Sequence, residues 1–224
     1  SLLQVKSIKY LGVELTTDMR NKEYLSTRIR STIRASFGLS SCGLLSRGMA
    51  SGMLFFTYKT YLRPILLYGV EAFNLSDLEI KRLETTESTL LKRYVGLPSR
   101  VHSTRLLAAG KLRMLGAEIA IRQCNFIIRL SQNEIMRNLV WIGRDSNLSI
   151  VAQQLGAKAH GMNSTAAVLM ALRQRVRLLT SESRELFVSR EVGQIAALIV
   201  LDQFKLPSEE KNRIDKMLAM LRAF

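Results

Sequence analysis

The sequence predicts a mainly α-helical fold, an antiparallel helical bundle with a short β-strand or hairpin at its N-terminus. Apolar residues recur at helical spacing along most of the chain, whereas the alternation typical of a strand is confined to residues 7–16. Residues 76–98 carry both a helix start signal and a helix stop signal. The expected loops are short, which favours antiparallel neighbours.

The first helix is expected over residues 19–38, after the β element. Its inner face would hold Leu25, Ile29, Thr32, Ile33 and Phe37, because these residues lie near 3.6 spacing. A second helix is predicted from about 47 to 61. Pro64 lacks an amide proton and should end or kink that helix, so residues 65–75 either restart as a helix or stay extended and buried.

The next helix, over residues 77–95, has the clearest boundaries. Ser76 and Glu79 form a capping-box pattern at its start, while Gly96 and Pro98 stop it. Its inner face is predicted to hold Leu78, Leu83, Leu90, Leu91 and Tyr94, with Lys81, Arg82, Lys92 and Arg93 outside. Further helices are expected over 103–109, 113–131, 134–143, 148–156, 165–180, 184–204 and 208–223.

The net charge of +15 and the isoelectric point near 10.3 indicate a polyanionic partner. Nucleic acid is the first expectation and an anionic membrane surface the second; a merely solvated basic surface is the alternative. No uninterrupted apolar run reaches about 18 residues, so membrane insertion is not expected. Cys42, Cys124, His102 and His160 fit no metal spacing, and no phosphate-binding glycine loop occurs, so neither metal nor cofactor is expected.

Three segments together resemble the region that follows the polymerase palm in non-LTR (LINE-type) retrotransposon reverse transcriptases. They are the run from Tyr58 to Phe73, with its Pro-Ile-Leu-Leu-Tyr-Gly-Val-Glu-Ala-Phe series, the Leu-Leu-x-x-x-x-Gly-Leu-Pro ending at residue 98, and Lys9-Tyr10-Leu11-Gly12-Val13 upstream. The resemblance covers residues 5–130 approximately. It implies a palm-closing β element over 1–16, a thumb-like helical bundle over 17–143 and a C-terminal helical region over 144–224.

The resemblance further implies that Tyr10, Leu11 and Gly12 correspond to a primer-grip turn. It begins after the catalytic hairpin of the relatives, and no Asp-Asp pair occurs in the sequence, so no catalytic residue and no enzymatic activity are expected. Because the chain begins at Ser1 rather than Met, we expect that an upstream segment has been removed or is absent.

We therefore expect a non-catalytic module that binds RNA or an RNA–DNA duplex, as a structural subunit of a ribonucleoprotein such as an organellar ribosome, alongside other proteins. Two alternatives remain: a C-terminal fragment of an active retrotransposon polymerase, and a helical protein-interaction scaffold. The compartment would be the mitochondrion for a ribosomal subunit, and the nucleus or cytoplasm for a retrotransposon product.

Basic residues on two expected helices are the candidate nucleic-acid contacts. The thumb helices of the relatives lie against the template–primer duplex, so we predict phosphate contacts there. A third cluster, Arg173, Arg175 and Arg177, is as well explained by a solvated face. Phe55, Phe56, Tyr58, Tyr61 and Tyr68 are expected in the core rather than as base-stacking platforms. The predicted nucleic-acid-binding residues are Lys22, Arg28, Arg30, Arg34, Lys92, Arg93, Arg100 and Arg105.

Overall fold

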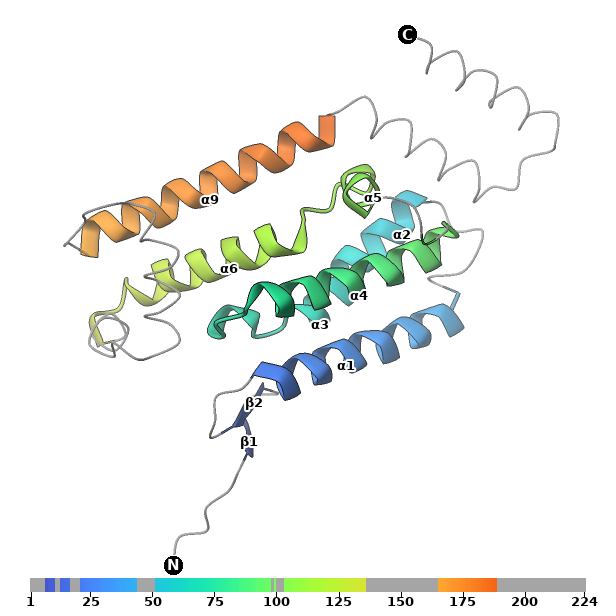
Figure 1. Ribbon diagram of the computed structural model, residues 1–224, viewed down its shortest axis with the longest axis horizontal. Coiled ribbons are helices and arrows are strands. Elements are labelled where there is room, and N and C mark those ends of the chain that lie inside the picture. Colours follow the sequence, from blue (N-terminus) through green and yellow to red (C-terminus); the bar gives the residue numbers. More distant parts are fainter. Residues whose placement is uncertain are drawn as a thin grey trace, which may run out of the picture. The chain divides into compact units, whose positions relative to one another are not determined.

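A computed structural model describes residues 7–10, 13–16, 21–43, 51–97, 99, 103–135 and 165–188, and the fold of these residues is mainly α (Figure 1). The elements are β1 (Ser7–Tyr10), β2 (Val13–Thr16), α1 (Asn21–Ser41), α2 (Ser51–Thr57), the π-helix η1 (Tyr58–Leu62), α3 (Arg63–Leu66), the 3₁₀ helix η2 (Val70–Ala72), α4 (Asp77–Val95), α5 (Ser103–Ala109), α6 (Leu115–Leu130) and α9 (Thr165–Val188).

The chain divides into two compact units that alternate along the sequence. Unit 1 combines residues 1–32, 65–84 and 115–182, and unit 2 combines residues 33–64, 85–114 and 183–224. Helices α1 and α4 each contribute residues to both units. The predicted domain limits at 16 and 143 follow the chain order instead, and they stay predictions.

Strands β1 and β2 form a two-stranded antiparallel sheet within the predicted span 7–16. Ser7 pairs with Thr16 and Tyr10 with Val13, which is the register of a tight hairpin. The half-buried Val13 packs against the core of unit 1. The hairpin therefore belongs to that unit.

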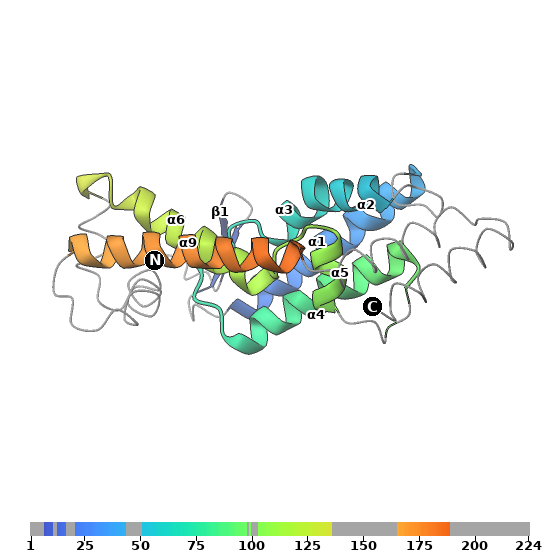
Figure 2. The ribbon, with the colours of Figure 1, turned by 90° about the horizontal axis from the view of Figure 1, so that it is seen from above.

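The core of unit 1 is closed by aromatic packing and by two long-range hydrogen bonds. The rings of Tyr24 and Phe73 stack with centroids 4.2 Å apart, and the Tyr24 hydroxyl donates to the Tyr68 carbonyl. Gln123 donates from Nε2 to the Phe73 carbonyl over 2.9 Å. Helices α6 and α9 run side by side in both views (Figures 1 and 2), with Leu172 packed among Cys124 and Ile127.

The core of unit 2 surrounds a buried ion pair. Arg63 and Glu87 lie 3.0 Å apart between Nε and Oε1, and the Tyr58 hydroxyl donates to the same Oε1 over 3.2 Å. Arg63 also donates to the Arg113 carbonyl. The apolar side chains around these residues are Leu54, Phe55, Leu62, Leu90, Leu91, Tyr94, Val95, Leu106, Leu107 and Leu112.

The π-helix explains how Tyr58 and Arg63 reach one carboxylate. Five residues in an α-helix turn through about 500°, which would leave these side chains about 140° apart. In the π-turn the Arg63 amide donates to the carbonyl five residues earlier, at Tyr58, so the two residues come onto nearly the same side. Pro64 was predicted to end or kink the helix; the helical backbone does not end there but continues through η1 into α3, and the kink stays a prediction.

The predicted limits of α4 and α5 are confirmed, and so is the capping box. Glu79 Oε2 accepts from the Ser76 amide over 2.8 Å, and the Glu79 amide donates to the Ser76 hydroxyl over 3.4 Å. At the other end Gly96 has φ of +79°, and the Leu97 amide donates to the Lys92 carbonyl over 2.9 Å. This is the bond that closes a helix ending in a left-handed glycine.

Two predicted core residues are on the surface instead. Phe37 is 49% exposed and Leu78 is 80% exposed, while Ser36 and Glu87 are buried. A prediction from apolar spacing alone places polar residues on the surface, so it could not find these two buried ones. Each can be buried because it has a partner: Ser36 donates to the Ile33 carbonyl, and Glu87 pairs with Arg63.

Two separate helices were predicted over 165–180 and 184–204. The predicted break between them was wrong, because α9 runs unbroken through Ser183 to Val188. Good helix formers surround Ser181 and Ser183, and Ser181 bonds back to the Leu178 carbonyl, so neither serine breaks the helix. The helices predicted over 148–156 and 208–223, and most of the one over 134–143, fall outside the described residues. Among the described helices, none is long and apolar enough to cross a membrane.

Candidate nucleic-acid interface

Positive charge is concentrated in unit 2. Among the described residues, unit 1 has eleven Lys and Arg residues against nine acidic residues, whereas unit 2 has nine Lys and Arg residues against two acidic ones. Those two acidic residues are Glu87, which is buried beside Arg63, and Glu185. The surface of unit 2 is therefore the part of the described protein best suited to a polyanion.

A long acid-free run accounts for much of this imbalance. From Tyr24 to Val70 the sequence contains no aspartate or glutamate. Protein surfaces normally intersperse both signs of charge, so the cations of this run can meet carboxylates only from outside the run, as Arg63 does at Glu87. The run includes Arg34 and Lys59, both exposed in unit 2.

Phe37 brings two of the predicted basic clusters together. The guanidinium carbon of Arg93, on α4, lies 4.9 Å from the centre of the Phe37 ring, on α1. Arg34 is three residues before Phe37, and residues three apart are neighbours on a helix face. Arg34 and Arg93 are therefore presented on one surface of unit 2, although they are far apart in the sequence.

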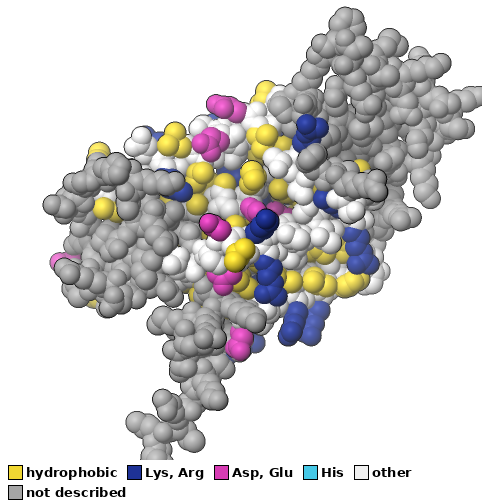
Figure 3. All heavy atoms as spheres, in the orientation of Figure 1, with side chains coloured by type: hydrophobic (Ala, Val, Ile, Leu, Met, Phe, Trp, Pro, Cys, Tyr) yellow, Lys and Arg dark blue, Asp and Glu magenta, His cyan; other side chains and the backbone are white. Residues whose placement is uncertain are grey.

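Lys92, the residue before Arg93 on α4, is a half-buried cation of the same unit. Its ammonium donates to the Ser99 carbonyl over 2.9 Å, which restrains the side chain near the end of α4. In the described part of the chain, neither Arg34 nor Arg93 forms an ion pair. We call Arg34, Lys92 and Arg93 the basic cluster. Lys and Arg side chains gather toward the lower right of the face drawn in Figure 3, where Figure 1 draws α1 and α4.

Of the other predicted nucleic-acid contacts with described side chains, two arginines are exposed and one is half-buried. Arg105, on α5 of unit 2, is exposed, and Arg30 is exposed one helical turn before Arg34. Arg28 is half-buried in unit 1, with its guanidinium carbon 5.3 Å from the centre of the Tyr68 ring and 5.9 Å from that of Tyr24. Arg28 therefore already stacks on two rings, although its role stays a prediction.

Several predicted residues have side chains outside the described part. These are Lys22, Arg100 and the predicted primer-grip residues Tyr10, Leu11 and Gly12. Of these five, only the backbone of Lys22 and Tyr10 is described. In the third cluster Arg173 and Arg177 are exposed and Arg175 is half-buried, as their spacing predicts.

The aromatic residues divide between the core and the surface. Phe55 and Tyr58 are buried as predicted, but Phe56, Tyr61 and Tyr68 are exposed, which contradicts the prediction for those three. The exposed lysine between Phe56 and Tyr61, Lys59, was also missed. The acid-free run was the sequence signal that could have drawn attention to this segment.

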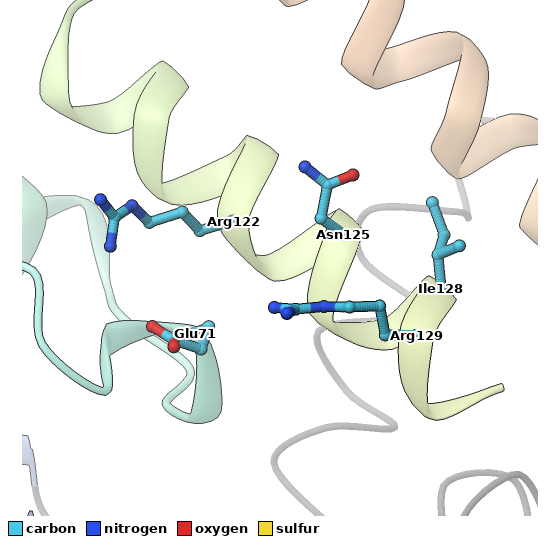
Figure 4. Close-up of a pocket in the computed structure, with 5 residues that line it drawn as sticks. All are labelled: Glu71, Arg122, Asn125, Ile128 and Arg129. Atoms are coloured by element: carbon cyan, nitrogen blue, oxygen red, sulfur yellow. The ribbon is translucent and has the colours of Figure 1, made fainter. Parts of the chain in front are cut away.

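A pocket in unit 1 has a charged lining. Its volume is about 510 Å³, and Figure 4 shows Arg122 and Arg129 extending from α6 toward the side where Glu71 lies on η2. Asn125 and Ile128 complete the lining. Glu71 Oε2 is buried without a hydrogen bond, and Arg122 Nε lies 3.3 Å from Glu118 Oε1.

The buried Cys124 lies next to the pocket residue Asn125 in the sequence, on the same helix α6. Burial raises the pKa of the neighbouring Cys124 thiol to about 11, so this thiol stays protonated at neutral pH and is a poor nucleophile. Across the described residues, no group of three or more His, Cys, Asp and Glu side chains is placed to hold a metal ion.

Comparison with protein-family models, curated proteins and solved structures gives no match for this chain.

Proposed function

We propose that this protein is a non-catalytic nucleic-acid-binding module that contacts the phosphates of RNA or of an RNA–DNA duplex. The observation that supports this best is the basic cluster, in which Arg93 lies over the Phe37 ring and Arg34 lies on the same helix face as Phe37; among the described residues of unit 2, the only exposed acidic side chain is Glu185. The resemblance to the thumb region of non-LTR reverse transcriptases agrees with this proposal. It also suggests a role within a larger ribonucleoprotein.

The arrangement favours phosphate contacts over base contacts. A guanidinium is always charged and can donate two parallel hydrogen bonds to one phosphate, so a pair of arginines can follow a backbone strand. The Phe37 ring restrains Arg93, which lowers the entropy lost when that side chain meets a phosphate. Contacts of this kind carry little sequence information, so binding should depend on shape and charge.

Charge reversal of the cluster tests the proposal. The double variant Arg34→Glu/Arg93→Glu should lower affinity for a duplex of about 16 base pairs by ten-fold or more at about 50 mM salt, and it should make the salt dependence shallower. Each arginine removed from a phosphate should reduce the slope of log K against log[salt] by about 1. Fluorescence anisotropy with a labelled RNA–DNA duplex measures both quantities.

The matched control is Arg173→Glu/Arg177→Glu, which makes the same change of charge at two exposed arginines of α9 in unit 1. Its effect should be several-fold smaller. Equal losses in the two double variants would show that only the overall charge matters and would remove the basic cluster as a site. A wild-type protein that binds no polynucleotide at low salt would overturn the proposed function itself.

A further inference from the structure

The outer side of α2 and η1 exposes large apolar side chains. Phe56 is 60% exposed, Tyr61 is 55% exposed and Met53 is 53% exposed, while Leu54 and Tyr58 on the opposite side are fully buried. Exposed aromatic residues are not required to fill the core of unit 2. They are available to a binding partner.

The π-turn aligns the two exposed rings. Tyr58 and Arg63 are five residues apart and both reach Oε1 of Glu87, which fixes how this segment is rotated about its axis. Phe56 and Tyr61 are also five residues apart, and they lie on the outer side of the same segment. One helical turn therefore separates two rings that an unbroken α-helix would point in different directions.

The charge of this face indicates which partner it fits. Lys59 lies between the two aromatic residues and is exposed, and the whole segment belongs to the acid-free run from Tyr24 to Val70. A docking face for another protein commonly carries both signs of charge at its rim. Two exposed rings with an exposed lysine between them, on a segment that itself carries no carboxylate, match the requirements of an unpaired polynucleotide, whose bases stack and whose phosphates need positive charge.

We infer that Phe56 and Tyr61 form a stacking platform for unpaired bases of a single-stranded nucleic acid, with Lys59 contacting the phosphate between them. This inference rests on the proposed function and deepens it, because it assigns a single-stranded segment to unit 2 in addition to a duplex. Stacking is tolerant of sequence, since every base has an aromatic face.

The test replaces the rings without removing their apolar character. The variant Phe56→Leu/Tyr61→Leu should bind a labelled oligouridine of about ten nucleotides at least ten-fold more weakly than the wild type, because base–aromatic stacking is lost. Its affinity for the RNA–DNA duplex should stay within about two-fold. The control Phe56→Tyr/Tyr61→Phe keeps both rings and should bind both probes like the wild type.

A spectroscopic readout separates stacking from general attraction. An oligonucleotide with a single 2-aminopurine should change its fluorescence on binding the wild type and the ring-preserving control, but not on binding the leucine variant at saturating concentration. Because both positions are exposed, the variants should fold, and circular dichroism with thermal melting verifies this.

The outcomes distinguish the inference from the proposed function. Unchanged oligouridine affinity in the leucine variant would show that Phe56 and Tyr61 do not stack on bases. The exposed face would then fit an apolar protein partner instead. Equal losses for oligouridine and duplex would also overturn the stacking platform, since the rings would then have no preference for unpaired bases. Failure of the wild type to bind either probe would overturn the proposed function as well.

Discussion

At the scale of single residues, buried polar groups decide the arrangement of unit 2. Tyr58, Arg63 and Glu87 are all buried: the Tyr58 hydroxyl donates to Glu87 Oε1, and Arg63 Nε lies at ion-pair distance from the same oxygen. Among the described residues, Glu87 Oε2 and Arg63 Nε have no hydrogen-bond partner. Burial raises the pKa of the Tyr58 hydroxyl well above its ordinary value, and the nearby Glu87 carboxylate raises it further. The phenol is therefore held in its neutral form as a hydrogen-bond donor.

Replacing Tyr58 by phenylalanine should have an effect that depends on pH. Unfolded tyrosine loses its proton near pH 10, whereas folded Tyr58 retains it, so the contribution of Tyr58 to stability is complete below pH 10 and falls as the pH rises further. Tyr58→Phe should cost about 1–2 kcal/mol at pH 8, and this difference from the wild type should narrow toward pH 11. Urea unfolding of both proteins measures it, and a constant difference would contradict the raised pKa.

At the scale of elements, local signals at the ends of α4 operate as the sequence predicts. The capping box supplies acceptors to two backbone amides that the helix itself leaves without partners, those of Ser76 and Glu79. Both ends of α4 are defined by local interactions, but these do not determine which face of the helix points into the core. Packing against the rest of the protein determines that. Packing buries Glu87 and leaves Leu78 exposed.

Loss of the cap should destabilise the protein by a predictable amount. Ser76→Ala should lower the free energy of unfolding by about 1 kcal/mol, whereas Ser76→Asp should keep most of it because aspartate also caps helix starts. The midpoint of chemical denaturation gives the comparison. Equal midpoints for the alanine variant and the wild type would show that this cap contributes nothing to the folded state.

At the scale of the whole molecule, the net charge of +15 couples stability to binding. Repulsion among like charges destabilises the compact state, and salt screens that repulsion. Raising the salt should therefore increase the melting temperature of the free protein while it weakens binding to nucleic acid.

The stabilisation of the protein by duplex RNA should decrease as the salt concentration rises, opposite to the trend for the free protein. At low salt, duplex in excess over its dissociation constant should raise the melting temperature, because a ligand that binds only the folded state stabilises it. This increase should disappear at about 200 mM salt or above. Thermal melts at several salt concentrations, with and without duplex, provide the measurement. Stabilisation by duplex that persists at high salt would argue against phosphate contacts as the main interaction.

The sequence was sufficient wherever the determining interaction is local. Apolar periodicity located α1, α4, α5 and α6 to within a few residues, and alternation located the hairpin, because these patterns depend on neighbours in the chain. The charge and the basic residues of α1 and α4 could likewise be read directly. The grouping of Arg34 and Arg93 on one surface could not be predicted, because Phe37, the ring that brings them together, was assigned to the core.

Tertiary structure alone decided which residues share a surface. The sequence determined that this chain is helical and basic, and that its cations occur on particular helices. Only the fold placed Arg93 on the ring of Phe37, and only the π-turn brought Tyr58 and Arg63 to Glu87 while it left Phe56 and Tyr61 outside. The physical reason is that a buried charge has to find its partner across the core, and that requirement overrides the helical spacing from which the exposed face would otherwise be predicted.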